Sequence, residues 1–304
     1  MHSILRIFLL FLYLLLLSCD AQKPSPSKIA KRWGFCYNLD KPSKVYELPE
    51  ELREISGLSM NLKTGELWAI QDEHAKVFQL QINDDKVKMS VVNFGEKGDY
   101  EGIANVEDDL VVVKSDGQLQ RIKNLGSHEQ KVIEIPTPLY IDNDVEGLCY
   151  DNHAQQLWLV CKEKAEIKNF DSDTDLKHKK AVYAFSLNQI RLESSPKILL
   201  DVSEVKDFVK KYYDIKDISI KPSAIEIHPL TKQIFMIASV GNLLLVFHQN
   251  GDFYYAVPLS QKDFPQPEGI TFDKHGNMFV SNEGKKGKAN LMLFKIVKEE
   301  DVLE

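Results

Sequence analysis

DYEGIANVEDDLVVVKSDGQL, the stretch Asp99–Leu119, contains a phrase that returns later in the chain. A glutamate precedes a glycine at the start of an apolar segment here, and the phrases DVEGLCYD and QPEGITFD repeat this arrangement at Glu146 and Glu268. A carboxylate without a partner is costly to bury, so such a residue is poorly suited to an ordinary core strand. The repetition therefore indicates one architectural position that is used several times.

Five phrases align on a small residue, and the intervals between successive small residues are 45, 45, 77 and 45 residues. The aligned positions are Gly57, Gly102, Gly147, Ala224 and Gly269. A period of this length is typical of the four-stranded blade of a β-propeller. A second apolar segment follows each phrase, in most cases across a turn rich in Asn, Asp or Gly, as in a β-hairpin.

The last repeat has only three strands before the chain ends, and an isolated strand-like segment, Ser43–Pro49, precedes the first repeat. We predict that this segment pairs with the strand around Leu291–Ile296, because an open seam would expose two sheet edges. The fold class is thus all-β, a propeller of five four-stranded blades. Six blades are the alternative if the long interval hides a degenerate blade or if Gly34–Leu39 belongs to one.

The long interval holds two segments that look like insertions. Lys164–Lys180 is polar and predicts a loop within blade three. Ser203–Asp214 has apolar residues at helical spacing and predicts one short helix, with Ser203 as its N-cap. Inserted loops of this kind often contribute to the binding face of a propeller.

The N-terminus predicts export and lipidation. Residues 1–18 contain one basic residue and an apolar run, as in a secretory signal peptide. The ending Leu-Leu-Ser-Cys resembles the bacterial lipoprotein box, which makes Cys19 the lipidated residue and ties the protein to a membrane. The alternative is an uncleaved anchor or an ordinary signal peptide. Residues 19–32 are polar and predict a linker, and residues 33–304 predict a single propeller domain. We expect a bacterial cell-envelope location, outside the cytoplasm.

The charge balance excludes one class of partner. The formal net charge is −7, and the chain has no long basic run. Nucleic-acid binding draws on clustered Lys and Arg, so we expect no nucleic-acid partner.

The residues directly before the aligned small residues are predicted to face one another around the central channel. They are Ser56, Glu101, Glu146, Ser223 and Glu268. Three carboxylates at one level repel each other unless a positive charge, a proton or hydrogen bonds compensate. We expect Glu101, Glu146 and Glu268 to hold a divalent cation, most plausibly Ca²⁺, or an ordered polar ligand. The alternative is that each carboxylate accepts backbone amide hydrogen bonds and joins the blades.

A second group of polar residues stands at the ends of the second strands. These rim residues are Asp72, Glu73, Lys114, Lys162, Asn282 and Glu283. Equivalent strand ends reach the same rim of a propeller, so we expect these side chains to converge there. Mixed acids and lysines suit a polar ligand or a hard cation. A solvated loop edge is the alternative.

The phrases EISGLSMNLKTGELWAIQDE, YEGIA, VEGLCYD, PSAIEIHPLTKQIFMIAS and PEGITFDKHGNMFVSNE, together with the lipoprotein-like leader, resemble the SdiA-regulated (YjiK-like) family of bacterial envelope β-propeller proteins. The resemblance covers about Pro42 to Ile296. It implies a propeller in the cell envelope and brings no established reaction.

Motifs of several enzyme classes are missing from the sequence, including a G-x-S-x-G nucleophile elbow, an H-E-x-x-H helix and a phosphate-binding glycine loop. This favours a membrane-tethered module that binds a polar small molecule or an envelope protein. One alternative is a metal-assisted hydrolase of the propeller lactonase or phosphoesterase kind. Another is a purely structural envelope protein.

Overall fold

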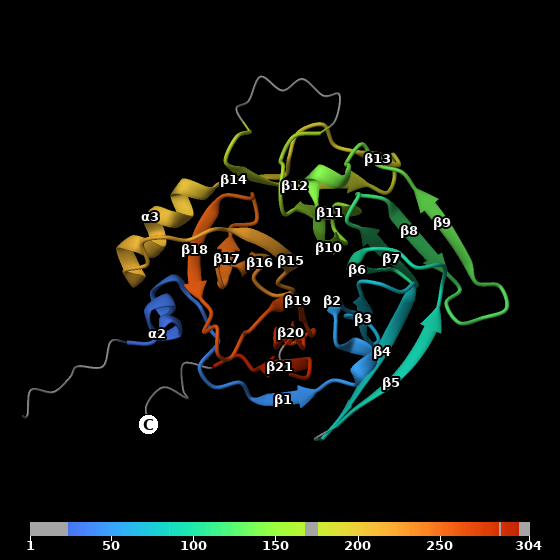
Figure 1. Ribbon diagram of the computed structural model, residues 1–304, viewed down its shortest axis with the longest axis horizontal. Helices are drawn as coiled ribbons and strands as arrows, with labels where there is room; N and C mark the ends of the chain where they lie inside the picture. The colour runs from blue at the N-terminus through green and yellow to red at the C-terminus, as the bar shows by residue number, and fades with distance from the viewer. Residues whose placement is uncertain (1–23, 85, 168–175, 286, 298–304) are drawn as a thin grey trace, which may run out of the picture.

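Five antiparallel sheets surround a central axis in the computed structural model, which describes residues 24–84, 86–167, 176–285 and 287–297 (Figure 1). The predicted signal peptide and Cys19 lie outside the described residues. Blades one and two follow the expected strand order from the axis outward. Their strands are β2 (Ile55–Met60), β3 (Leu67–Gln71), β4 (Lys76–Asn83) and β5 (Lys86–Asn93), then β6 (Tyr100–Val106), β7 (Asp109–Lys114), β8 (Leu119–Lys123) and β9 (Lys131–Ile135).

Blade three differs at its outer edge, where two short strands share the fourth position by pairing with opposite ends of one strand. Its strands are β10 (Val145–Asp151), β11 (Gln156–Cys161), β12 (Lys179–Ser186), β13 (Arg191–Leu192) and β14 (Ile198–Asp201). Blade four is regular, with β15 (Lys221–Ile227), β16 (Ile234–Val240), β17 (Leu243–Phe247) and β18 (Phe253–Pro258).

The fifth blade closes the ring as predicted. It consists of β19 (Pro267–Phe272), β20 (Met278–Asn282) and β21 (Asn290–Phe294), and its outer strand is the N-terminal β1 (Lys44–Glu47). The register pairs Lys44 with Leu293 and Glu47 with Asn290. The closure prediction is therefore confirmed, because β1 completes the sheet formed by β19, β20 and β21.

The core lies between the blades. Five clusters of buried apolar side chains each join two neighbouring blades, and together they complete the circle. Middle strands such as β7 and β17 are apolar along nearly their whole length because both of their faces are covered. Each blade thus depends on its neighbours, which is why a closed ring matters.

The N-terminal segment that was predicted as a linker packs in part against the propeller. Helix α2 (Pro26–Ala30) and the 3₁₀ turn η1 (Lys31–Trp33) precede β1, and Ala30 is fully buried. The ring of Trp33 stacks 5.8 Å from that of Tyr255 in blade four. The described part of the predicted linker, residues 24–32, thus contacts the propeller through buried Ser27 and Ala30, and Trp33 is the first residue of the predicted domain.

Two further expectations are resolved by the fold. Gly34–Leu39 forms no strand, although it buries Phe35, Tyr37 and Leu39, so it does not build a sixth blade. The predicted helix is α3 (Val202–Tyr213), and its N-cap is Asp201, whose carboxylate accepts a 2.9 Å hydrogen bond from the amide of Ser203. The N-cap prediction was therefore wrong by two residues.

The insertion Lys164–Lys180 is described only in part, because residues 168–175 lie outside the described residues. In the described parts of the chain, no helix has the length and apolar character needed to cross a membrane.

Candidate functional site

The first strands of the five blades, β2, β6, β10, β15 and β19, line the axis and contact one another in sequence around it. Each of them has a break in register at the predicted ring position. The residues left out of the pairing are Ser56, Glu101, Glu146, Ser223 and Glu268. A β-bulge re-aims the side chain of the unpaired residue, so one irregularity, used five times, turns these side chains toward a common point.

The small residue after each bulge allows the strands to approach closely. A Cβ atom on Gly102 would lie 2.8 Å from the backbone nitrogen of Leu148, and one on Gly57 would lie 3.2 Å from the Cα atom of Gly102. The first distance is too short for a Cβ atom unless the backbone shifts, and the second is tighter than most Cβ contacts. Glycine is therefore favoured at both positions for close packing between blades.

All five ring residues border one cavity of about 10 Å³ at this end of the axis. A space of this size holds about one water molecule. The predicted convergence of the five residues is thus what the geometry gives, but the channel is nearly closed at their level. We call this region the carboxylate end.

A lysine provides the positive charge at the carboxylate end. The Nζ atom of Lys162, at the end of β11, forms an ion pair with Glu146 and lies 3.5 Å from the Oδ2 atom of Asp144. Burial works against the charged form of Lys162, but attraction to Glu146 outweighs it and raises the pKa of the ammonium group. Lys162 therefore stays charged at neutral pH.

Burial raises the pKa values of all three ring carboxyls. The pKa of Glu101 rises to about 10 through burial and repulsion from Glu146 and Asp99. The pKa of Glu268 rises to about 8 through burial and the charges of Glu146 and Glu283. Burial raises the pKa of Glu146 to about 7, although Lys162 opposes the rise. At neutral pH, protons on Glu101 and Glu268 and the ammonium of Lys162 relieve the repulsion within the ring.

The hydroxyls of the ring bind backbone carbonyls. Ser223 Oγ donates a 3.0 Å hydrogen bond to the carbonyl of Pro267 and so joins blades four and five, and Ser56 Oγ donates to the carbonyl of Glu54 at 3.4 Å. No backbone amide of a described residue donates to Glu101, Glu146 or Glu268 in the hydrogen bonds of the structure. Of these two serines, only Ser223 therefore joins two blades, because Ser56 bonds within its own blade.

Metal binding at the carboxylate end stays a prediction. Within the described ranges, no group of three or more His, Cys, Asp and Glu side chains is arranged to hold a metal ion. The ammonium of Lys162 already occupies one side of Glu146. A calcium ion would have to replace this lysine and the protons on Glu101 and Glu268.

Three of the six predicted rim residues lie near the ring or near the acidic residues that precede it: Lys162, Glu283 and Asp72. Lys162 pairs with Glu146, as described above. Burial and the nearby charge of Glu54 raise the pKa of Asp72. Burial also raises the pKa of Glu283, to which the charge of Asp72 contributes. These side chains share the electrostatic environment of the ring, and their role in binding stays a prediction.

The other three rim residues are directed elsewhere. Lys114 Nζ lies 3.8 Å from Asp116 Oδ2 on its own hairpin, and Glu73 Oε2 lies 3.8 Å from the ring of its neighbour His74. Asn282 is fully buried within blade five, where its amide donates a 3.0 Å hydrogen bond to Asn290.

Sequence reasoning missed a second circle of polar residues, which stands two positions before the ring residues. Its members are Glu54, Asp99, Asp144, Lys221 and Gln266. Asp144 contacts Lys162, and Asp99 accepts a hydrogen bond from Ser115. The signal was present in the repeated phrases, where an acidic residue recurs two places before the ring position in the first three repeats.

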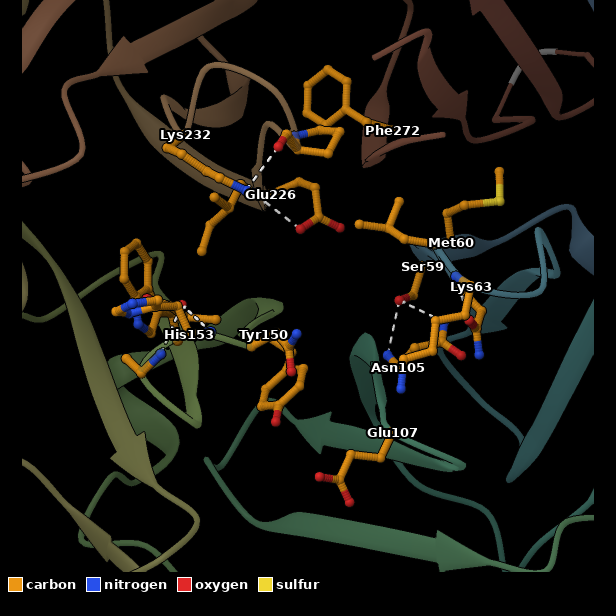
Figure 2. Close-up of a pocket in the computed structure, with 18 of the residues that line it drawn as sticks. Ser59, Met60, Lys63, Asn105, Glu107, Tyr150, His153, Glu226, Lys232 and Phe272 are labelled. Carbon is orange, nitrogen blue, oxygen red and sulfur yellow. Dashed lines mark hydrogen bonds between the residues drawn. The ribbon is translucent and has the colours of Figure 1, made fainter. Parts of the chain in front are cut away.

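The opposite end of the axis opens into a cavity of about 820 Å³, which sequence reasoning also missed (Figure 2). We call it the axial pocket. All five blades contribute to it, through the ends of their first strands and the turns that follow. Its lining includes Ser59, Met60, Lys63, Asn105, Glu107, Tyr150, His153, Trp158, Lys197, Glu226, Ile227, Lys232 and Phe272. In the sequence these turns carry only the pattern of tight hairpins, which gives no sign of a common cavity.

Hydrogen bonds between blades fix the wall of the axial pocket. The backbone amide and the side-chain amide of Asn105 both donate to Ser59 Oγ at 2.9 Å. The amide of Met60 donates to Thr271 Oγ1 at 3.0 Å, and Thr271 Oγ1 donates to Glu226 Oε2 at 3.2 Å. The pocket is therefore held in shape by contacts between blades one and two, one and five, and four and five.

Solved structures with a similar fold are distant in sequence. Glutaminyl cyclase from Myxococcus xanthus has a TM-score of 0.55 at 12% identity, over 85% of this chain and 97% of that chain. A luciferin-regenerating enzyme has a TM-score of 0.51 at 11% identity, over 84% and 95% of the two chains. Virginiamycin B lyase from Staphylococcus aureus has a TM-score of 0.43 at 14% identity, over 83% and 69%. At these identities the likeness to the first two structures shows the fold alone.

No curated protein matches the sequence. The family model described as SdiA-regulated matches residues 43–286, from the closing strand β1 to the turn before β21. This match covers more than half of the chain and includes all five ring residues, so the protein belongs to the SdiA-regulated family.

Proposed function

We propose that this protein is a lipid-anchored envelope protein whose propeller binds a ligand in the axial pocket. The observation that supports this most directly is the cavity of about 820 Å³ to which all five blades contribute. Pockets for small molecules commonly measure about 300–1,000 Å³ and combine apolar walls with a few fixed polar groups. The axial pocket has both, because Met60 and Ile227 stand beside the hydrogen-bonded Glu226.

A concave pocket with a fixed wall favours a small molecule over an extended protein partner. Figure 2 shows side chains from several blades around one opening, with Glu226, Tyr150 and Asn105 at different sides of it. A flat protein surface would contact only the edge of the opening. We therefore assign the pocket to a polar small molecule, and the outer faces of the propeller remain available for binding an envelope protein.

The proposed anchor is the lipid on Cys19, and its support is the lipoprotein-like ending of the leader. Mass spectrometry of the N-terminus of native protein tests it. We expect Cys19 as the first residue, carrying acyl chains. A Cys19→Ala protein that retains acyl chains at its N-terminus contradicts the assignment.

The binding role is tested by blocking the pocket. Ala154 lies on an exposed turn that lines the pocket, so Ala154→Trp places a large ring at the opening. His128 is exposed on the turn between β8 and β9 and does not line the pocket. His128→Trp is therefore the matched control. The probes are four sets of defined organic molecules, which are anionic, cationic, zwitterionic and neutral. We expect at least one set to raise the melting temperature of the wild type and of the control.

The same set should have no effect on Ala154→Trp. If no set changes the melting temperature, or if the blocked variant responds like the wild type, the axial pocket is not a ligand site.

A further inference from the structure

The axial pocket contains both acidic and basic side chains that have no charged partner. Its lining includes the bases Lys63, Lys197 and Lys232 and the acids Glu107, Asp151 and Glu226. Among the described residues, none of these six takes part in an ion pair. The carboxylate end of the same axis contrasts with this, because there Lys162 pairs with Glu146. The pocket therefore has charges of both signs available for a ligand.

Glu226 is the acid that faces the space within the pocket. Figure 2 shows its carboxyl group pointing into the opening from β15. It is half-buried, and its two oxygens accept one hydrogen bond each, from the amide of Ile227 at 2.9 Å and from Thr271 Oγ1 at 3.2 Å. A carboxylate oxygen has two lone pairs, so each oxygen keeps acceptor capacity. Burial raises the pKa of Glu226 to about 7, although the hydrogen bonds from Ile227 and Thr271 oppose the rise.

The lysines stand at the outer part of the pocket and come from three blades. Lys63 follows β2, Lys197 precedes β14 and Lys232 precedes β16, and all three are exposed. Lys232 Nζ donates to the carbonyl of Pro229 at 2.8 Å, and Lys197 Nζ lies 5.4 Å from the centre of the Trp158 ring. Neither contact neutralises the charge. Such ammonium groups form strong, charge-assisted hydrogen bonds with anionic oxygens, including those of a carboxylate.

We propose that the axial pocket binds a zwitterionic molecule, such as a short peptide with free ends, whose ammonium group pairs with Glu226 and whose carboxylate meets the lysines at the opening. This inference rests on the proposed function and specifies its ligand class. The body of the ligand packs against Met60, Ile227 and Tyr150. The volume of about 820 Å³ is suited to a molecule of this size.

Ligands with a single charge fit the pocket less well. An anion satisfies the lysines but brings a second negative charge toward Glu226. A cation pairs with Glu226 but is repelled by the three lysines at the opening. These lysines have no ion-pair partner among the described residues. Like charges brought together without compensation are costly, and specificity arises from this repulsion as much as from attraction.

The experiment uses one pool of tripeptides in four forms that differ only at their ends. These are free peptides, N-acetylated acids, C-terminal amides with a free amine, and peptides that are blocked at both ends. The readout is the melting temperature of the wild-type protein, followed by calorimetric titration of individual peptides. We expect the free form to bind, N-acetylation to weaken binding about tenfold or more, and C-terminal amidation to weaken it to a smaller extent.

Glu226→Gln should lose the preference for a free amine, so free and N-acetylated peptides should bind it equally. Glu129→Gln, an exposed acid between β8 and β9, is the matched control and should behave as the wild type. If N-acetylated peptides bind the wild type as well as free peptides do, the inference is wrong. If no peptide form binds while another class of molecule binds the wild type but not Ala154→Trp, the inference fails and the proposed function stands. If nothing binds at all, both fail.

Discussion

The two ends of the propeller axis are built from the same five strands. They differ in whether their charged side chains have partners within the protein. The carboxylate end encloses about 10 Å³, and its charges are met within the protein by Lys162 and by protons. The axial pocket encloses about 820 Å³, and its charged side chains have no ion-pair partner among the described residues. The first arrangement compensates its charges within the protein, whereas the second leaves charges for a ligand.

The difference arises from the residues that each strand places at each level. At the carboxylate end the strands carry Gly or Ala, and the backbones nearly touch. Three positions further along, the same strands carry larger side chains, and all of these line the pocket. They are Met60, Asn105, Tyr150, Ile227 and Phe272. Small residues draw the strands together at one end, and larger ones border the opening at the other.

The largest effect should come from removing the internal counter-ion of the carboxylate end. Lys162→Met leaves Glu146, whose side chain is only 9% exposed, without its positive partner. Breaking a buried ion pair by deleting one partner costs about 3–5 kcal/mol, and the partial exposure of Lys162 places the expected loss near the lower value. Urea unfolding at pH 8 measures it. The loss should be smaller at pH 5, where Glu146 is protonated.

Lys164→Met is the matched control for this prediction. Lys164 pairs with Asp142 at 2.7 Å, but both side chains are largely exposed, so the unfolding midpoint should not change measurably. Equal destabilisation by the two substitutions would show that Lys162 has no special role at the carboxylate end.

A smaller effect should follow from the raised pKa values of the ring. The pKa of Glu101 is about 10 in the folded protein against an ordinary value of 4.5, so the folded state binds the proton more tightly than the unfolded state. Stability is therefore fully present below about pH 4.5 and is lost as the pH rises toward the folded pKa. Glu101→Gln removes this loss. We expect it to stabilise the protein by about 1 kcal/mol or more at pH 8 and to flatten the pH profile of stability.

Glu226→Gln provides the comparison at the pocket end. The pKa of Glu226 is about 7, so its contribution falls only between about pH 4.5 and pH 7 and should be smaller than that of Glu101. A Glu101→Gln protein with the same pH profile as the wild type would contradict the assignment of a proton to Glu101 at neutral pH.

The sequence allowed the fold to be predicted because a propeller repeats one local pattern. The interval of 45 residues, the strand before the first repeat and the missing strand at the end together gave five blades and their closure. The convergence of Ser56, Glu101, Glu146, Ser223 and Glu268 followed from the same alignment. Repeated positions in equivalent blades must lie at one level around the axis.

The parts that sequence reasoning missed depend on a strand bulge, on burial and on turns that come from different blades. The ion pair of Lys162 with Glu146 depends on the bulge in β10, which takes Glu146 out of the pairing next to the end of β11, and the repeat spacing does not show this bulge. Asp144 and Asp99 stand two places before ring residues in the sequence, but their effect on the ring carboxyls depends on burial, which the sequence does not give. The axial pocket combines turns of different sequence, so no repeated pattern marks it. The N-cap of α3 was misplaced because Asp201 and Ser203 are both good caps.

The smallest expected effect concerns calcium, and it compares the two ends most directly. A calcium ion at Glu101, Glu146 and Glu268 must displace Lys162 from Glu146 and remove the protons from the other two carboxyls. Any rise in melting temperature on adding calcium to metal-free wild-type protein should therefore be small at pH 7 and greater at pH 9. It should be larger in Lys162→Met, which frees one side of Glu146, and absent in Glu146→Gln. Glu226→Gln should leave the response unchanged, because Glu226 belongs to the other end. If neither the wild type nor Lys162→Met responds at pH 9, with elemental analysis confirming metal-free starting protein, the carboxylate end holds no calcium and Lys162 alone supplies its positive charge.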